Sequence, residues 1–214
     1  MLFIDTESEE GNNDDIEGHF YLLKSIYKFN DYYSYTKGIK LNICRRDNGN
    51  REIIGELSGH FFNLALLDRD KKMPKIITVL QQYNEETYDI CRNLVRETGC
   101  HKGKGENIYH LDRLYIEPKF RGNGIGRNIL QGFEQNIEQI IGEKVRYIGL
   151  YPDPITNDLR YDSMEDMSKQ ERDIKVRSLK NFYSSLGFKE MKCEPNYMYL
   201  DLKEMEAKFL FHTI

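Results

Sequence analysis

The chain has 214 residues, of which 31% are charged and 39% are hydrophobic, and its formal net charge is −4 at pH 7. This length is enough for one substantial core and short for two. No apolar run is long enough to span a bilayer, and no basic segment precedes a short apolar one, so we expect neither a membrane span nor a secretory leader, and a cytoplasmic location.

The acidic balance bears on the partners that we expect. Negative surfaces repel nucleic-acid backbones and attract cationic amines, so the sequence predicts no nucleic-acid partner. The cysteines stand far apart, without the Cys-x-x-Cys pairs typical of zinc sites, which predicts reduced, packed thiols and no metal. These cysteines are Cys44, Cys91, Cys100 and Cys193.

The first 18 residues hold many acids and no base. This composition predicts a flexible, solvated segment over residues 1–18, followed by a single domain over residues 19–214. The acids are Asp5, Glu7, Glu9, Glu10, Asp14, Asp15 and Glu17.

The next part of the chain has the composition of β-strands. Residues 19–29, 37–46 and 51–67 are rich in Ile, Leu, Tyr and Phe, and Asp47-Asn48-Gly49-Asn50 is typical of a hairpin turn. The pattern predicts an antiparallel meander of three strands.

A helical pattern follows over residues 74–97. Pro74 suits the first turn of a helix and Gly99 suits its end, so the spacing predicts one long helix or two short ones. The apolar residues at helical spacing are Ile76, Ile77, Leu80, Tyr83, Cys91, Leu94 and Val95.

An apolar run over residues 108–116 predicts a buried strand. The segment from Arg127 to Ile141 is amphipathic with helical spacing and stops at Gly142, and residues 145–150 form another apolar run. A strand, a crossover helix and a second strand within this distance form a βαβ unit, so the two strands should be parallel. The fold class is therefore mixed α/β.

The turn between the first of these strands and the helix reads Arg121-Gly122-Asn123-Gly124-Ile125-Gly126. Glycines at a helix start let an anion approach the unpaired N–H groups, where the helix dipole adds positive charge. The spacing fits neither a Walker A loop nor the Gly-x-Gly-x-x-Gly fingerprint of dinucleotide-binding folds. We expect a phosphorylated ligand of another kind.

A second motif, Leu179-Lys180-Asn181-Phe182-Tyr183-Ser184-Ser185-Leu186-Gly187-Phe188, lies downstream. Leu179, Phe182, Tyr183 and Leu186 share one helix face, and Gly187 suits a left-handed helix end. Residues 188–193 and 197–202 then have the pattern of a closing hairpin.

Together the two motifs resemble those of the GCN5-related N-acetyltransferases, the GNAT superfamily. Arg-x-x-Gly-x-Gly after Leu114-Tyr115-Ile116-Glu117-Pro118 is similar to the acetyl-CoA pyrophosphate loop, and Phe182-Tyr183 before Gly187-Phe188 is similar to the second signature. The resemblance covers residues 108–202. It implies the GNAT fold (α/β, or α+β), with a mixed sheet of about six to seven strands, flanking helices and a βαβ acetyl-CoA-binding core.

The resemblance implies acetyl-CoA as cosubstrate. The N–H of Leu114 would polarise the thioester carbonyl, Ile116 would bond the pantetheine arm through its backbone, and Arg121 with the turn after it would hold the pyrophosphate. The cofactor-binding residues so implied are Leu114, Tyr115, Ile116, Arg121, Gly122, Asn123, Gly124, Ile125, Gly126, Arg127 and Asn181.

The catalytic candidates are Tyr183, His110 and Asp112. Tyr183 matches the family tyrosine that protonates the leaving thiolate. Strict alternation along residues 108–116 would put His110, Asp112, Leu114 and Ile116 on one face of the strand. His110 falls where several GNAT enzymes carry a general base; the alternative is a structural histidine. Asp112 could bind the amine, orient His110 or pair with an arginine.

We therefore predict direct acetyl transfer, in a ternary complex, to a primary amine of a small molecule or protein. The alternatives are a non-catalytic acyl-CoA sensor or interaction module, favoured by Val176 where many family members have asparagine, and a transferase for a longer acyl-CoA. Residues 155–173 are predicted to form a lid, a surface loop or a surface helix. A homodimer is left open.

Overall fold

The computed structural model describes residues 3–5, 20–27, 35–47, 50–69, 85–99, 106–155 and 167–204. Within them the strands form one mixed sheet of eight strands, in the order β1-β2-β3-β4-β5-β6-β8-β7. The predicted fold class is confirmed, and one very short edge strand that was not predicted, β1, brings the sheet to eight strands. No helix in the described ranges has the length and apolar character needed to cross a membrane.

The first half of the chain forms the predicted antiparallel meander. Strands β2 (Phe20–Tyr27), β3 (Thr36–Asp47) and β4 (Asn50–Phe62) pair in sequence order. Strand β1 (Phe3–Asp5) pairs in parallel with β2. It lies inside residues 1–18, for which flexibility was predicted; the other residues of that segment lie outside the described ranges.

The third predicted strand, residues 51–67, ends earlier than expected. After Phe62 the chain enters a short helix, α1 (Leu64–Arg69). The reason is local capping, because the side chain of Asn63 accepts the N–H of Leu66 at 2.9 Å, and the side chain of Asn107 accepts the N–H of Ala65 at 3.2 Å. An asparagine within an apolar run thus starts a helix in this position.

Helix α3 (Glu85–Thr98) is the carboxyl-terminal part of the predicted helix 74–97; residues 74–84 lie outside the described ranges. It ends as predicted, since Gly99 has φ 67° and its N–H bonds the carbonyl of Val95 at 2.9 Å. Cys44, Cys91 and Cys193 form no disulfide bond with one another.

The βαβ unit is confirmed. Strand β5 (Ile108–Ile116) leads through a short 3-10 turn, η2 (Pro118–Phe120), into α4 (Ile125–Ile141), and β6 (Tyr147–Leu150) pairs with β5 in parallel. Gly142 ends α4 with φ 76°, and its N–H bonds the carbonyl of Glu138.

Helix α5 (Lys169–Ser184) carries the second motif and starts with a reciprocal capping box. Ser168 Oγ accepts the N–H of Glu171, and the Glu171 carboxylate accepts the N–H of Ser168. The chain then turns through Gly187, with φ 97°, into the predicted hairpin of β7 (Lys189–Glu190) and β8 (Met198–Asp201).

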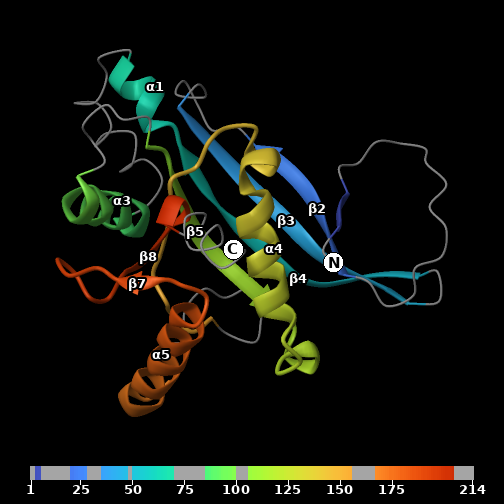
Figure 1. The fold of residues 1–214 in the computed structure, drawn as a ribbon. Coiled ribbons are helices and arrows are strands. Elements are labelled where there is room, and N and C mark those ends of the chain that lie inside the picture. Colours follow the sequence, from blue (N-terminus) through green and yellow to red (C-terminus); the bar gives the residue numbers. More distant parts are fainter. Residues whose placement is uncertain are drawn as a thin grey trace, which may run out of the picture.

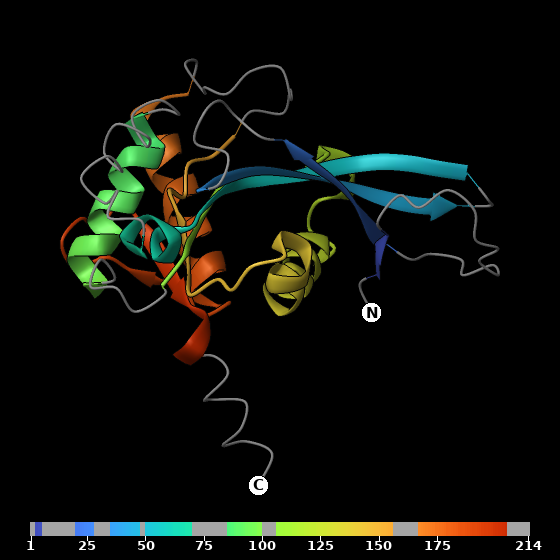
Figure 2. The same cartoon turned by 90° about the horizontal axis from the view of Figure 1, so that it is seen from above.

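Two apolar clusters fill the two faces of the sheet. Helix α4 packs with α5 on one face, while α1 and α3 lie on the other, as Figures 1 and 2 show from perpendicular directions. The apolar cluster under α4 contains Tyr109, Leu111 and Tyr183, whereas the apolar cluster under α3 contains Ile108 and Tyr147. Strand β5 therefore lies between both cores and is buried on both faces over its first residues.

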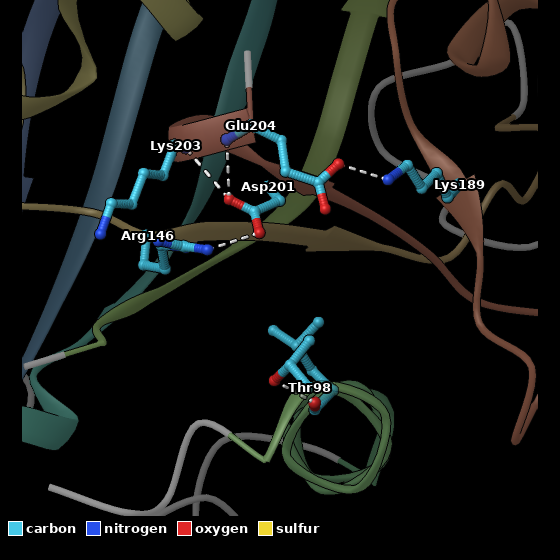
Figure 3. Close-up of polar contacts among 7 residues, drawn as sticks. Thr98, Arg146, Lys189, Asp201, Lys203 and Glu204 are labelled. Atoms are coloured by element: carbon cyan, nitrogen blue, oxygen red, sulfur yellow. Dashed lines mark hydrogen bonds and ion pairs between the residues drawn. The ribbon is translucent and has the colours of Figure 1, made fainter. Parts of the chain in front are cut away.

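An ion-pair network holds the strands that follow the site (Figure 3). Arg146, just before β6, donates to Asp201 at the end of β8 at 2.7 Å. The other carboxylate oxygen of Asp201 accepts the N–H groups of Lys203 and Glu204, and Glu204 pairs with Lys189 in β7. Because Asp201 is only 8% exposed, its pair with Arg146 is largely shielded from solvent, whereas the Lys189–Glu204 pair is exposed. Together these contacts connect β6, β7 and β8.

Candidate functional site: a cleft where two parallel strands separate

The site begins where β5 and β6 separate. Their pairing includes Ile108 with Tyr147, Tyr109 with Ile148 and His110 with Gly149, and it stops there although β5 continues to Ile116. A cleft of about 640 Å³ occupies the gap. Its lining residues are Leu111, Asp112, Arg113, Leu114, Ile116, Phe120, Arg121, Gly122, Gly124, Ile125, Gly126, Arg127, Tyr151, Asp153, Pro154, Ile155, Lys175, Ser178, Leu179, Phe182 and Tyr183.

A β-bulge at Asp112 overturns the predicted alternation along β5. Arg113 pairs with Ser58 while Leu111 pairs with Gly59, so Asp112 is an extra residue on β5. After the bulge, Leu114 and Ile116 pack in the cluster on the α4 face, together with Leu111. His110 therefore does not share a face with Leu114 and Ile116, contrary to the strict period of two.

The unpaired edge of β5 presents backbone groups to the cleft. Glu117 N–H donates to Ile54 O on β4 at 2.9 Å, so by alternation the N–H groups of Leu114 and Ile116 point to the opposite edge, toward the cleft. The carbonyl of Ile116 points the same way and accepts a bond from Arg121 Nε at 2.6 Å. Two donors on this edge thus face the cleft, and one acceptor is already occupied.

The glycine turn has the conformation that an anion site needs. Gly122 and Gly124 have φ of 81° and 75°, a region that residues with a Cβ atom rarely adopt. Gly124 is the N-cap of α4, and within the described part of the chain no side chain caps the first N–H groups of this 17-residue helix. Arg127 in the first turn donates to Ser185 Oγ at 2.7 Å, which ties the start of α4 to the end of α5.

Helix α5 forms the opposite wall with one stripe of its surface. Lys175, Ser178, Leu179, Phe182 and Tyr183 line the cleft at helical spacing. Tyr183 is 9% exposed, and burial raises the pKa of its phenol to about 12. The phenol is therefore protonated throughout the neutral pH range.

Several residues of the predicted site do not line the cleft. Tyr115 is buried, with the Arg121 guanidinium 5.4 Å from its ring centre. Asn123 is exposed and bonds the carbonyl of Arg121, and Asn181 is exposed on another face of α5. His110 is fully buried behind the cleft.

His110 faces α3, where it meets two residues that the sequence analysis missed. Its Nδ1 lies 3.0 Å from Thr87 Oγ1, and its Nε2 lies 3.3 Å from Glu86 Oε1. When Nδ1–H donates to Thr87, Nε2 keeps its lone pair. Nothing in the sequence connects the first turn of α3 with β5; only the folded chain brings Glu86 beside His110.

A second histidine, His60, pairs with His110 across β4 and β5, and the two ring centres are 6.1 Å apart. Burial, followed by the repulsion of His110, lowers the pKa of His60 to about 4, although Asp112 acts in the opposite direction. His60 is therefore neutral at pH 7, and it adds no positive charge beside His110.

Comparison with solved structures gives distant similarities in fold. The KacTA–DNA complex is 13% identical to this chain, with 82% of this chain and 74% of that chain covered and a TM-score of 0.42. AtaT complexed with acetyl-methionyl-tRNAfMet is 15% identical, with 80% of this chain and 75% of that chain covered and a TM-score of 0.41. AtaTR bound with AcCoA is 13% identical, with 80% of this chain and 72% of that chain covered and a TM-score of 0.42. No protein of curated function matches significantly.

These structures correct the prediction that nucleic acid is not a partner. The similar structures include one complex with DNA and one with an acylated tRNA, so the exclusion is wrong. The physical reason is that a net charge of −4 sums over the whole chain. Cations gather locally at the cleft, which Arg113, Arg121, Arg127 and Lys175 line.

The acetyltransferase (GNAT) domain family matches residues 85–190. This range begins at α3, includes the whole βαβ unit and its glycine turn, and ends in β7 after Tyr183. It therefore contains the start of α4 and the face of α5 that line the cleft. The chain belongs to the GNAT superfamily of acetyl-CoA-dependent N-acetyltransferases, with its acetyltransferase domain in residues 85–190.

Proposed function

We propose that the cleft holds acetyl-CoA and that the enzyme transfers its acetyl group directly to a primary amine. The observation that carries this proposal is the separation of β5 from β6 beyond the His110–Gly149 pair, between an uncapped helix start and the buried Tyr183. An extended ligand with a phosphate at one end matches a cleft of this form.

On the donor side, the pyrophosphate would lie at the start of α4, against the N–H groups that follow Gly124. The pantetheine arm would add to the free edge of β5 as a further strand does, with Ile116 N–H as donor. Leu114 N–H would then donate to the thioester oxygen, where negative charge develops during attack. Arg121 would keep the Ile116 carbonyl occupied.

On the acceptor side, the amine must lose a proton before it attacks. An ordinary lysine-like amine, with a pKa near 10.4, is neutral about one time in 2,500 at pH 7, a cost of roughly 4.6 kcal/mol. Asp112 lines the cleft and His110 Nε2 lies within 4.8 Å of it. The proton would leave the amine at Asp112 and be held at His110 Nε2, behind the cleft.

The transfer forms the N–C bond and breaks the C–S bond; the electron pair leaves on sulfur, and the nitrogen releases its second proton to solvent. Tyr183 would donate a hydrogen bond to that sulfur. Because the phenol has a pKa of about 12 and an ordinary thiol one near 8.5, complete proton transfer is uphill by about 4.8 kcal/mol. Tyr183 would therefore stabilise the thiolate by hydrogen bonding, and solvent would supply the thiol proton.

The test compares Tyr183→Phe with Tyr199→Phe, a tyrosine of β8 that does not line the cleft. CoA release is measured with a panel of primary amines that includes small molecules, peptides and aminoacyl-tRNA. We expect Tyr183→Phe to lower kcat by tenfold or more while CoA affinity stays nearly unchanged, and Tyr199→Phe to leave both intact. Equal rates in the wild type and Tyr183→Phe would refute the role of Tyr183, and no CoA release with any amine would refute the function.

A further inference from the structure

Three side chains on the α3 side of the cleft come together from two elements. Glu86 from α3 and His110 and Asp112 from β5 place one ligand atom each within 4.8 Å of one another. Asp112 also lines the cleft, so the cluster is continuous with the proposed acetyl-CoA site. We call Glu86, His110 and Asp112 the α3 cluster.

The α3 cluster carries uncompensated negative charge. The nearby carboxylates Asp89 and Asp153 are paired with Arg92 and Arg172, at 2.9 and 2.7 Å. In the described part of the chain, neither Glu86 nor Asp112 pairs with a lysine or arginine. Two carboxylates this close together attract a cation strongly, because each also repels the other.

His110 Nε2 points into this cluster without a hydrogen-bond partner. The residue is 0% exposed, and its Nε2 makes no hydrogen bond within the described residues: in the Nδ1–H tautomer this nitrogen is an acceptor, and the Glu86 carboxylate 3.3 Å away has no proton to donate. A buried polar atom without a partner costs free energy, and a ligand that bonds it removes this cost. Its neighbour Glu86 is 39% exposed, so the cluster is accessible from solvent at that side chain.

An aromatic pair lies beside the cluster. Tyr151 lines the cleft, and its ring centre is 5.4 Å from that of Tyr197. Burial, with smaller contributions from Asp89 and Glu86, raises the pKa of Tyr197 to about 12, so these acids lie close to the phenol. An incoming cation would therefore meet neutral aromatic rings beside the carboxylates.

Resting on the proposed function, we infer that the α3 cluster binds the acceptor as a primary ammonium ion and selects amines that have no carboxylate next to the reacting nitrogen. A primary ammonium has three N–H donors. The Glu86 and Asp112 carboxylates and His110 Nε2 supply three acceptors, and the last of them holds the released proton. An α-amino acid would place its own carboxylate against Glu86 and Asp112, which repel it.

The acceptors are therefore amines in which the carbon next to the reacting nitrogen carries no carboxyl group, or carries one that is blocked as an amide or ester. Polyamines, lysine side chains, peptide amino termini and aminoacyl esters belong to this class, whereas free amino acids do not. The carriers differ in size, but the local chemistry at the nitrogen is the same.

The experiment uses the full chain loaded with CoA and a set of amino-acid amides, each matched with its free amino acid. Binding is measured by calorimetry, and acetylation by CoA release with acetyl-CoA. We expect at least one amide to bind, and every amide that binds to exceed its free amino acid by tenfold or more in affinity and in kcat/KM. Glu86→Gln should weaken amide binding about tenfold without changing CoA affinity.

The matched control is Glu85→Gln, which removes the same charge from the neighbouring exposed position of α3. It should leave amide binding unchanged, and Tm values of both variants show whether α3 stays folded. Equal effects of the two variants, free amino acids that bind as well as amides, or absence of amide binding would overturn the inference. So would stoichiometric binding of Zn²⁺ or Mn²⁺ that Glu86→Gln abolishes.

The binding and turnover measurements separate this inference from the proposed function. Amide binding that depends on Glu86, without CoA release, supports the ammonium site while the transfer function fails. CoA release from amides and free amino acids at equal rates supports the function while the selectivity fails.

Discussion

Acidification should destabilise the fold through His60. The pKa of this histidine is about 4 in the folded chain and near 6.5 when unfolded, so the unfolded chain binds the proton more readily. The contribution of neutral His60 to the free energy of unfolding is then fully present above pH 6.5 and is lost as the pH drops toward 4. The difference between the two values, at 1.36 kcal/mol per pKa unit, corresponds to at most about 3.4 kcal/mol.

The assay is urea denaturation of the wild type and His60→Gln at pH values between 7.5 and 4. Other titrating groups are common to both proteins, so the difference in the free energy of unfolding isolates His60. Glutamine does not titrate, and the variant should therefore gain about 3 kcal/mol relative to the wild type between pH 7.5 and pH 4. A difference that stays constant over this range would show that His60 is not held neutral by burial.

Three further predictions concern stability and the glycine turn. Glu134 Oε1 is buried without a partner among the described residues, and burial raises the pKa of this carboxyl group from 4.5 to about 8. The fold therefore loses stability as the pH rises between these values, and in urea denaturation Glu134→Gln should stabilise it by up to about 4 kcal/mol at pH 8 and little at pH 4. Gly124→Ala and Gly142→Ala, at the two ends of α4, replace glycines with the same left-handed φ, and each should cost about 1–2 kcal/mol of stability. Only Gly124→Ala should also lower CoA affinity, by about tenfold in calorimetry. Equal CoA affinities of the two variants would contradict the role of the turn. Asp201→Ala should lower the free energy of unfolding by about 2–4 kcal/mol because it leaves the half-buried Arg146 unpaired. Glu52→Ala breaks the exposed pair with Lys119 and should lower it by under about 1 kcal/mol. Similar losses of Tm in the two variants would contradict this account.

The donor half of the site follows from local sequence because its features are local. A glycine at positive φ before a helix and an aromatic stripe at helical spacing depend on neighbours within a few residues. The stripe from Leu179 to Leu186, extended back by one turn, also includes Lys175 and Ser178, which line the cleft. These residues were missed although the same spacing indicates them.

The acceptor half could not be predicted in this way, because it depends on pairing between distant segments. The bulge at Asp112 exists only because β4 and β5 pair with a shift between Ser58 and Gly59. One sequence signal was present. A Cβ atom at Gly59 would lie 2.1 Å from the carbonyl oxygen of His110, so a glycine in the interior of β4 marked the close approach.

Under the proposed function, the bulge also explains how one strand could serve both substrates. Before Asp112, His110 faces α3; after it, Leu114 and Ile116 lie on the face of α4 and α5. A regular strand would place all of these residues on the same face, with the proposed base beside the cofactor instead of opposite it. Since β6 has already separated from β5 at this point, no paired strand closes the gap between the two faces. Under the proposed function, the extra residue would let a donor bound on one side of the sheet meet an amine that enters from the other, as direct transfer requires.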